Sequence, residues 1–414
     1  MNVRPASGTA GVPEAAARVG LLDLFLTFLR LGSVAFGGYM SLISVVENTV
    51  VRKRRLLAHE TMLDGIALAN LLPGPIAVNV VAYVGHRLRG VPGAIAAAAG
   101  VTLPAFVLLV VLSELYFRYG GLPAFQKVFA GILPAVAAIV LVTVWRLGRK
   151  TLTGGREMLL AAVAAAVMLG LLRSHAVYAP LLALAAGGLV GAWWFRPAAA
   201  TGAVDTRTAL RRLAPALGLA VLLIGAFLFP PPLARDGVAF IALTFAGMSL
   251  LLFGGGYVFI PVMGSLVVLQ LGWLSQQEFV DGIALGQLTP GPIVITATFI
   301  GYKVAGLAGA AAATVAIFGV PAAMMLLAAH ALDAVRGAPR VQAVTRGLHC
   351  AVVGLIFVAG MVILHSALPA GAAAPADWLL PLGIFAAALV ALGRFRLDVV
   401  WVIPAAGGLG FILL

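Results

Sequence analysis

The tripeptide Pro73-Gly74-Pro75 constrains this chain strongly, because it lies inside the apolar run Ala67 to Val84. Each proline removes a backbone N–H and glycine adopts conformations closed to other residues, so a continuous helix does not pass through the three. The same tripeptide recurs as Pro290-Gly291-Pro292, at an offset of 290 − 73 = 217 in the numbering. We therefore expect two helices that break inside apolar surroundings.

The composition is that of an all-α polytopic membrane protein, with 62% hydrophobic residues, 10% charged residues and a mean hydropathy of +1.10. The apolar runs are long and continuous, which excludes a β-barrel, where apolar and polar residues alternate. The net charge of +13 is interpreted as basic residues gathered in cytoplasmic loops, not as a nucleic-acid surface. A single cysteine, Cys350, excludes an intramolecular disulfide and a cysteine-based metal site, and no metal or cofactor is expected.

Much of the chain is an internal duplication that keeps this offset. Eleven of the twenty positions 57–76 are identical to positions 274–293, including Asp64 to Leu68 against Asp281 to Leu285. Phe36-Gly37-Gly38 likewise returns as Phe253-Gly254-Gly255. We expect a disordered cytoplasmic tail over 1–19, one repeat over 20–196, a basic linker with a linking transmembrane helix over 197–236, and a second repeat over 237–414.

The distribution of positive charge predicts that the two repeats have inverted topology. Arg52 to Arg55 join the two broken segments of the first repeat, whereas their counterpart, Leu269 to Gln276, carries no positive charge. The first repeat returns to a basic cluster at Arg146, Arg149 and Lys150. By the positive-inside rule, these clusters and the N-terminus are cytoplasmic. Paired broken helices in inverted repeats are the layout of secondary transporters, which bind substrate near the bilayer midplane.

The apolar runs that open the first repeat have two interpretations. They extend from Leu21 to Val51 and from Leu56 to Tyr83, and both are flanked by positive charge. Each is either a re-entrant hairpin that turns at its break, with arms of about 15 residues and about 22 Å, or a single kinked span. We favour the hairpin for the second run. Four ordinary spans follow, over 91–117, 125–144, 158–172 and 177–195.

The broken helices supply the candidate substrate site. A helix that begins just after Pro-Gly-Pro presents free N–H groups and partial positive charge, which favour an anion. Asn70 and Gln287 precede the breaks, and Asn79 and Thr296 follow them; these side chains donate hydrogen bonds either to an oxyanion or to a neighbouring helix. The predicted substrate-binding residues are Arg30, Gly37, Gly38, Asn70, Pro73, Gly74, Pro75, Asn79, Gly254, Gly255, Gln287, Pro290, Gly291, Pro292 and Thr296.

Charged residues near the breaks are candidates for gating or coupling, namely Glu47, Arg52, Asp64, Arg87, Asp281 and Lys303. An arginine inside an apolar run needs a partner or a polar cavity, so Arg30 either pairs with Asp23 or faces the anion. Arg87 and Lys303 recur in register, and snorkelling to the surface is the alternative role for Arg87.

The duplicated acids Asp64 and Asp281 serve either in proton coupling or in helix capping and pairing with a basic loop. Glu47 is expected to pair with Arg52 or Arg54. The sequence has no phosphate-binding Gly-Lys-Ser/Thr loop and no visible nucleophile–base arrangement. We therefore expect neither an ATP-driven pump nor an enzyme.

The paired motifs around the breaks are distinctive. In the first repeat they are Leu31-Gly32 with Phe36-Gly37-Gly38, Glu47 with Arg52 and Arg54, Ala67 to Pro75, and Gly85-His86-Arg87; in the second they are Phe253 to Tyr257, Trp273-Leu274-Ser275 and Leu285 to Pro292. These motifs resemble the chromate ion transporter family over 20–196 and 237–414. The resemblance implies a two-domain inner-membrane anion transporter that exports chromate and whose halves lie antiparallel.

From both lines of reasoning we predict a multi-pass secondary transporter of a bacterial inner membrane that exports chromate. Membrane potential or proton motive force would drive it, since an inside-negative potential favours exit of a dianion by about 4.6 kcal/mol per 100 mV. The alternatives are a transporter of sulfate or another oxyanion, or an anion channel. The expected partners are the oxyanion and the lipid bilayer, with no nucleic acid; a homodimer is a further hypothesis.

Overall fold

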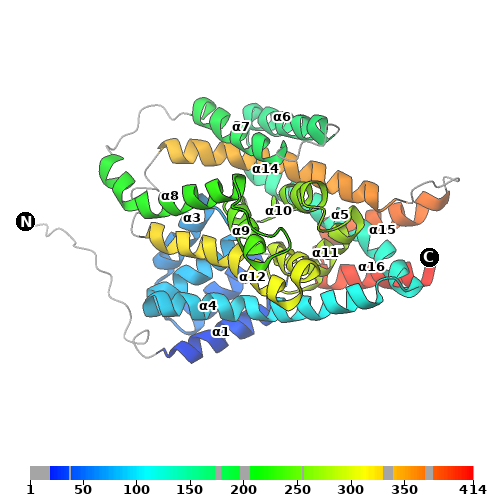
Figure 1. Cartoon of the computed structure of the whole chain (residues 1–414), viewed down its shortest axis with the longest axis horizontal. Helices are drawn as coiled ribbons and strands as arrows, with labels where there is room; N and C mark the ends of the chain where they lie inside the picture. Colours follow the sequence, from blue (N-terminus) through cyan, green and yellow to red (C-terminus); the bar gives the residue numbers. More distant parts are fainter. Residues whose placement is uncertain are drawn as a thin grey trace, which may run out of the picture.

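The computed structural model describes residues 19–36, 39–172, 179–195, 206–253, 256–329, 339–368 and 376–413, and every regular element in these ranges is a helix. The longer helices run along the long axis of the molecule (Figure 1). Four helices are long and apolar enough to cross a membrane, over 76–119, 123–151, 293–328 and 341–366. The prediction of an all-α polytopic membrane protein is therefore confirmed.

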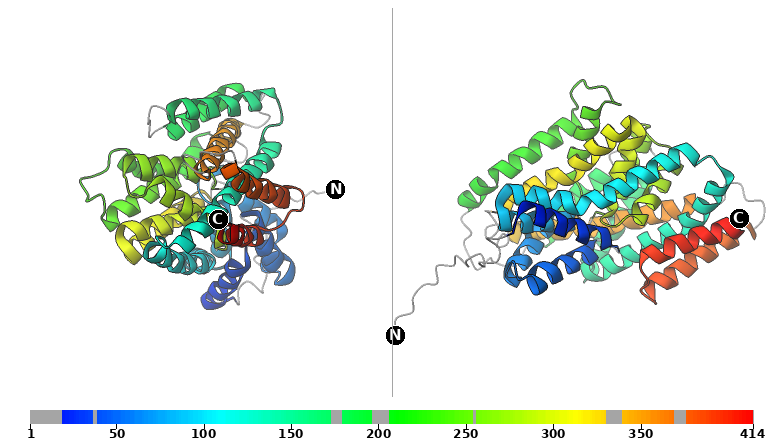
Figure 2. Two further views of the ribbon diagram at one scale, coloured as in Figure 1. Left: turned by 90° about the vertical axis from the view of Figure 1, so that its right-hand side faces the viewer. Right: turned by 90° about the horizontal axis from the view of Figure 1, so that it is seen from below.

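The helices of the first repeat follow the predicted order of apolar segments. They are α1 (Leu21–Val34), α2 (Tyr39–Glu47), the π-helical η2 (Asn48–Lys53), α3 (His59–Leu71), α4 (Ile76–Tyr119), α5 (Pro123–Thr151), α6 (Gly155–Leu172) and α7 (Ala179–Trp194). α6 and α7 lie at one edge of the bundle, packed on α14 (Pro339–Ser366) (Figure 2). The course of the first apolar run through Gly37 and Gly38 lies outside the described residues.

The second repeat follows α8 (Thr206–Leu228), which occupies the position expected for the linking helix. Its elements are α9 (Val238–Ser249), α10 (Phe259–Gly264), the π-helical η3 (Ser265–Gln270), α11 (Gln276–Leu288), the short η4 (Ile293–Ile295), α12 (Thr296–Ala328), α14, α15 (Ala376–Gly393) and α16 (Val399–Leu413). The π-helical segments η2 and η3 begin at Asn48 and Ser265, which are related by the offset of the sequence repeat, so the duplication extends to unusual local geometry.

The first Pro-Gly-Pro forms the tip of a helical hairpin between α3 and the start of α4. Gly74 at the tip has φ +105°, a conformation that glycine alone adopts readily. A Cβ on Gly65 would lie 2.6 Å from Tyr83 Cδ1, and both residues are nine positions from Gly74, so the two arms run antiparallel. The chain turns back at this break, as expected, and does not continue as one kinked span.

The second Pro-Gly-Pro forms the equivalent hairpin between α11 and the start of α12. Gly291 has φ +113°, and a Cβ on Gly282 would lie 2.5 Å from Phe299 Cδ1. The sequence Ser-Gln-Gln-Glu sets the start of α11, because the Ser275 hydroxyl accepts from the Glu278 N–H and the Glu278 carboxylate accepts from the Ser275 N–H. This capping box satisfies two of the N–H groups left free at a helix start.

Both α4 and α12 fold back on themselves after the hairpin, at Gly90 (φ +62°) and Gly306 (φ +57°). Residues eight apart in a straight helix lie about 12 Å apart along its axis. A Cβ on Gly85 would instead lie 2.3 Å from the carbonyl oxygen of Gly93. The small-residue run that begins at Gly90 therefore permits close helix packing, and the long crossing segment of α4 begins only after this turn.

Each hairpin tip is held by the other repeat. The Gly74 N–H donates to the Leu252 carbonyl at 2.6 Å, and the Gly291 N–H donates to the Ala35 carbonyl at 3.1 Å. Ala35 and Leu252 are fully buried and are themselves related by the offset of the sequence repeat, so the two bonds are equivalent and reciprocal. A buried N–H needs a partner where water is excluded, so neither repeat satisfies its tip alone.

Candidate functional site

A small polar cavity of about 60 Å³ lies beside the second hairpin tip. Its walls come from α5, from the segment before α10, from the end of α11 and the tip that follows it, and from the end of α15 and the start of α16. The lining residues are Ile139, Val142, Thr143, Arg146, Tyr257, Gln287, Thr289, Gly291, Leu392 and Val399. The site therefore combines a helix of the first repeat with the broken helix of the second.

Arg146 brings positive charge to this cavity. It follows Ile139, Val142 and Thr143 on α5 at spacings that place all four side chains on one face of a helix. One nitrogen of its guanidinium, Nη2, donates to the Leu392 carbonyl at 2.6 Å. This bond uses one of the five N–H donors of a guanidinium and fixes the others at the cavity wall.

Gln287 supplies a second donor at the same place. Within the described part of the chain, its amide nitrogen Nε2 is buried and has no hydrogen-bond partner. A buried donor without a partner costs about 1–3 kcal/mol, so it needs a water or a ligand to satisfy it. Gln287 was predicted as an anion-binding residue; the structure places it in the cavity lining, and anion binding itself stays a prediction.

The other three predicted polar donors hold their own hairpins. Asn70 is exposed and its Nδ2 donates to the Ile66 carbonyl at 2.8 Å. Asn79 is fully buried and its Nδ2 donates to the Pro73 carbonyl at 3.2 Å. The Thr296 hydroxyl donates to the Ile293 carbonyl of η4 at 2.9 Å. These bonds are local to each hairpin, so they are not the bonds to a neighbouring helix that the sequence left open as an alternative. Anion binding by these three residues stays a prediction.

The two tips differ in packing although their sequences match. A Cβ on Gly74 would lie 2.2 Å from Pro321 Cβ, whereas a Cβ on Gly291 would meet nothing closer than Ala105 Cβ at 3.9 Å. The first tip is thus sealed by a proline of α12, and the second borders the polar cavity.

The face of α14 that corresponds in sequence to the cavity-lining face of α5 also lacks the polar groups of the cavity. Gly131 of α5 aligns with Gly347 of α14 in the duplicated sequence. The same alignment places Val362 and Ala359 where the first repeat has Arg146 and Thr143. The site is therefore asymmetric, in contrast to the duplicated sequence motifs.

The charged residues near the first hairpin form surface pairs. Asp23 pairs with Arg54 at 2.9 Å, so the predicted alternative in which Arg30 pairs with Asp23 is wrong. Arg30 is exposed on α1. Glu47 pairs with Arg52 at 3.6 Å, which confirms one of the two partners expected for it, and also approaches His59 Nδ1 at 3.5 Å.

Asp281 is buried in the second hairpin and accepts hydrogen bonds from neutral groups. Tyr116 of α4 donates at 2.7 Å and Gln277 donates at 3.1 Å. The predicted capping or pairing with a basic loop is therefore wrong for Asp281, because Tyr116, from the other repeat, and Gln277 donate the hydrogen bonds to its carboxylate. Its duplicate, Asp64, is half-buried on α3.

The two basic residues that recur in register have different partners. Lys303 pairs with Glu278 at 2.8 Å and lies 4.8 Å from the centre of the Phe117 ring. Arg87 donates to the Tyr83 hydroxyl at 2.9 Å, and its side chain is exposed. Position 61, the counterpart of Glu278, is a threonine, which removes the carboxylate from the first repeat.

Sequence reasoning missed Arg146 and Tyr116 as residues near the breaks. Arg146 was assigned only to a basic cytoplasmic cluster; its helical spacing from Thr143 was the available signal. The predicted glycines Gly37, Gly38, Gly254 and Gly255 lie outside the described residues. Among the described residues, no group of three or more His, Cys, Asp or Glu side chains is placed to hold a metal ion.

Comparison with known proteins identifies the family. The model of one family, described as chromate transporter, matches residues 22–192 and 239–411. This chain belongs to the chromate transporter family. The two matched segments correspond to the two repeats, and the family is described as one of transporters. The chain is accordingly a multi-pass membrane transport protein.

Individual relatives in the chromate transporter family cover most of the chain. A chromate transport protein of Cupriavidus metallidurans is 31% identical over 359 residues, which is 87% of this chain and 86% of that protein. A chromate transport protein of Pseudomonas aeruginosa is 32% identical over 425 residues, 100% of this chain and 97% of its own length. An uncharacterized transporter of Methanocaldococcus jannaschii is 33% identical over 308 residues, 74% and 75% of the two chains. No solved structure matches the chain.

Proposed function

We propose that this protein exports chromate from the cytoplasm across the inner membrane of a bacterium. Its family and the names of its relatives support chromate as the substrate. The observation that carries the proposal is the joint placement of Arg146 and the unpartnered Gln287 amide at the second Pro-Gly-Pro tip. A guanidinium and an amide N–H are donors suited to the oxygens of a tetrahedral dianion.

The inverted arrangement of the repeats determines which side of the membrane this site faces. The C-terminal end of α5 carries Arg146, Arg149 and Lys150, and the positive-inside rule places it on the cytoplasmic side. The cavity at the second tip then faces the cytoplasm, and Pro321 closes the first tip toward the other side. The described conformation fits a transporter open inward, in which an anion enters beside Arg146 and reaches Gly291.

Movement of the two hairpin tips relative to the opposite repeats would complete the transport cycle. Among the described residues, one backbone hydrogen bond joins each tip to the other repeat, so the two repeats can separate at one tip while they stay joined at the other. Export needs no coupled proton on energetic grounds, because the membrane potential favours exit of a dianion by about 4.6 kcal/mol per 100 mV.

The test of the site is chromate uptake into everted membrane vesicles, which corresponds to export from cells. We expect Arg146→Gln and Gln287→Ala each to lower uptake at subsaturating chromate by about 10- to 100-fold, since a hydrogen bond to a charged group contributes about 1.5–3 kcal/mol. Arg149→Gln is the matched control, because Arg149 is exposed and lies 5.2 Å from the centre of the Trp145 ring, away from the cavity.

Equal loss of uptake in the Arg149→Gln control, or full uptake in the Arg146→Gln and Gln287→Ala variants, would contradict the site. Sulfate has nearly the same shape and charge as chromate, so competition by sulfate in the same vesicles decides how narrow the substrate class is. Uptake that rises with chromate concentration without saturation would indicate a channel and contradict a transporter.

Access to the site can be tested separately from transport. Cys350 is the only cysteine and is buried, so a Cys350→Ala background leaves introduced cysteines as the reactive thiols. Gln287→Cys in that background should react with a membrane-impermeant maleimide in everted vesicles and not in intact cells. Labelling from the periplasmic side only would overturn the proposed orientation.

A further inference from the structure

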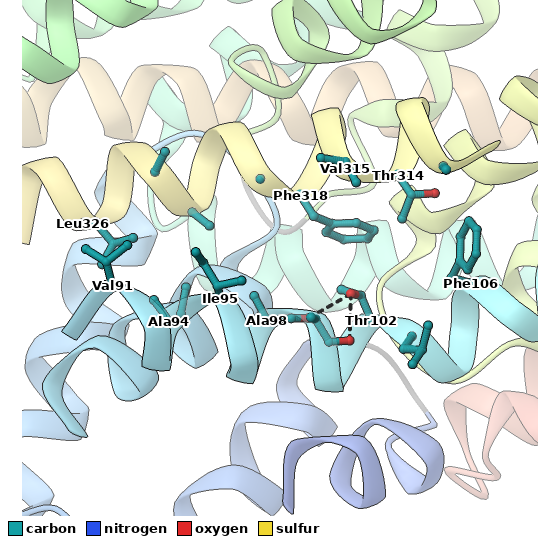
Figure 3. Close-up of a pocket in the computed structure, with 17 residues that line it drawn as sticks. Val91, Ala94, Ile95, Ala98, Thr102, Phe106, Thr314, Val315, Phe318 and Leu326 are labelled. Atoms are coloured by element: carbon teal, nitrogen blue, oxygen red, sulfur yellow. Dashed lines mark hydrogen bonds between the residues drawn. The ribbon is translucent and has the colours of Figure 1, made fainter. Parts of the chain in front are cut away.

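A large apolar groove of about 560 Å³ runs between α4 and α12 (Figure 3). The two helices pass each other in opposite directions, with Val91 near Leu326 at one end and Phe106 near Thr314 at the other (Figure 3). The equivalent helices of the two repeats thus form its two walls. From Val91 to Phe106 the groove follows about 15 residues of α4, or about 22 Å.

The groove is a crevice with a closed floor and an exposed rim. Ala82, Ala94 and Ala322 pack together as a buried cluster where the two helices touch. Ile95 and Val315 form part of the rim, and their side chains are 64% and 71% exposed. Small side chains create the space, and the open side faces outward from the bundle, where the bilayer surrounds a membrane protein.

The lining offers nothing to a polar ligand. Its only two polar side chains are Thr102 and Thr314, whose hydroxyls donate to the Ala98 and Ala310 carbonyls of their own helices at 2.8 and 2.7 Å. With those hydroxyls satisfied, the lining matches a hydrocarbon chain. The volume lies within the range of about 300–1,000 Å³ that is usual for ligand sites.

Positive charge lies at one end of the groove. Arg87 and Arg89 precede Val91 by four and two residues, and both side chains are exposed. Neither forms an ion pair with a carboxylate in the described residues; Arg87 donates only to the Tyr83 hydroxyl. At the opposite end, the equivalent basic residue Lys303 is neutralised by Glu278. The groove therefore has one cationic end that is not compensated within the described chain.

We propose that this groove binds an anionic phospholipid, with one acyl chain between α4 and α12 and the phosphate against Arg87 and Arg89. The positive-inside rule places these arginines on the cytoplasmic side, where a basic pocket between transmembrane helices suits anionic headgroups. A groove of about 22 Å is long enough for a chain that fills one leaflet, which is half of a hydrocarbon core of about 30 Å.

A second copy of the protein fits the groove less well than a lipid chain. A helix with its side chains is about 10–12 Å in diameter, whereas the floor of the groove is closed by the contact of α4 with α12. Association of two copies through this face would also bring Arg87 and Arg89 of each copy near an interface that offers them no carboxylate in the described part of the groove.

The test is lipid binding to the purified full-length protein, measured by native mass spectrometry and by thermal shift in mixed micelles. The probes are dioleoyl phosphatidylglycerol and dioleoyl phosphatidylcholine, which share acyl chains and differ in headgroup charge. We expect phosphatidylglycerol to be preferred by about 25-fold, since each arginine near an anionic lipid contributes a factor of about five. Arg87→Gln with Arg89→Gln should abolish that preference.

The groove itself is tested by Ala98→Phe, which fills it and should reduce retention of both lipids. Ala166→Phe on the exposed side of α6 and Arg156→Gln at its start are matched controls outside the groove, and both should leave lipid binding unchanged. If Ala98→Phe fails to fold, the two arginine substitutions at the surface still decide the headgroup preference. Equal binding of the two lipids by the unmodified protein would overturn the proposal, as would a disulfide-linked dimer of Ile95→Cys in the Cys350→Ala background.

Discussion

The two hairpin tips give the sharpest test of the structure, because the same substitution has different surroundings at each. Gly74 and Gly291 have nearly equal φ angles of +105° and +113°. A methyl group on Gly74 would lie 2.2 Å from Pro321 Cβ, whereas on Gly291 its nearest neighbour would be Ala105 Cβ at 3.9 Å. Gly74→Ala therefore adds a steric clash to backbone strain, and Gly291→Ala adds strain alone.

The expected magnitudes follow from these two contributions. Strain of a non-glycine residue at such φ values costs about 1–3 kcal/mol at either tip. Overpacking costs about a further 1–3 kcal/mol at Gly74 only, because Pro321 is a ring in the interior of α12 and cannot rotate away. Gly74→Ala should thus destabilise the protein by about 2–6 kcal/mol and Gly291→Ala by about 1–3 kcal/mol.

The assay is thermal unfolding of the purified variants in one detergent at one scan rate, since membrane proteins often unfold irreversibly. Pro321→Gly removes the clashing ring and closes a double-mutant cycle. We expect Pro321→Gly to recover part of the stability lost in Gly74→Ala and none of that lost in Gly291→Ala. Equal destabilisation at the two tips, with no rescue by Pro321→Gly, would refute the packing difference on which the inward-open assignment rests.

Substitutions at three further residues test two contacts and one backbone conformation by the same thermal measurement. Tyr116→Phe removes a donor from the buried Asp281 carboxylate and should cost about 1–3 kcal/mol; no loss of stability would show that the bond across the repeats is not formed. Arg55→Gly should raise stability by up to about 1 kcal/mol, because Arg55 has φ +50°; a large loss would contradict that backbone conformation. Arg346→Ala should cost about 1–3 kcal/mol, since it leaves the buried Glu157 carboxylate without its ion-pair partner; Arg346→Lys should retain part of the stability.

Several features of the fold could be predicted because they depend on chemistry within a few neighbouring residues. Prolines at positions 73 and 75 break a helix wherever they stand, and the hairpin at Gly74 follows from that local rule. The capping box at Ser275 and the turn at Gly90 also depend on short-range geometry, although neither was predicted from the sequence. Apolar length and composition likewise predicted membrane helices without reference to any contact between them.

The candidate site was only partly predictable, because charge in a sequence does not reveal which helix face it lies on relative to another repeat. Gln287 was predicted from its position before the break, but Arg146 was expected only in a surface cluster. It reaches the cavity because α5 packs against α11 and α16. Asp281 was expected to meet a basic group, and Tyr116, from a distant part of the chain, reaches it instead.

The sequence alone determined that this protein is a duplicated membrane transporter whose helices break at Pro73-Gly74-Pro75 and again at Pro290-Gly291-Pro292. Those features depend on residue type and spacing, which the chain carries wherever it folds. Tertiary structure alone decided that the two breaks are unequal, since Pro321 seals Gly74 while a polar cavity borders Gly291. The physical reason is that identical motifs acquire different neighbours when the two repeats pack against each other, and packing between repeats is not encoded in either motif.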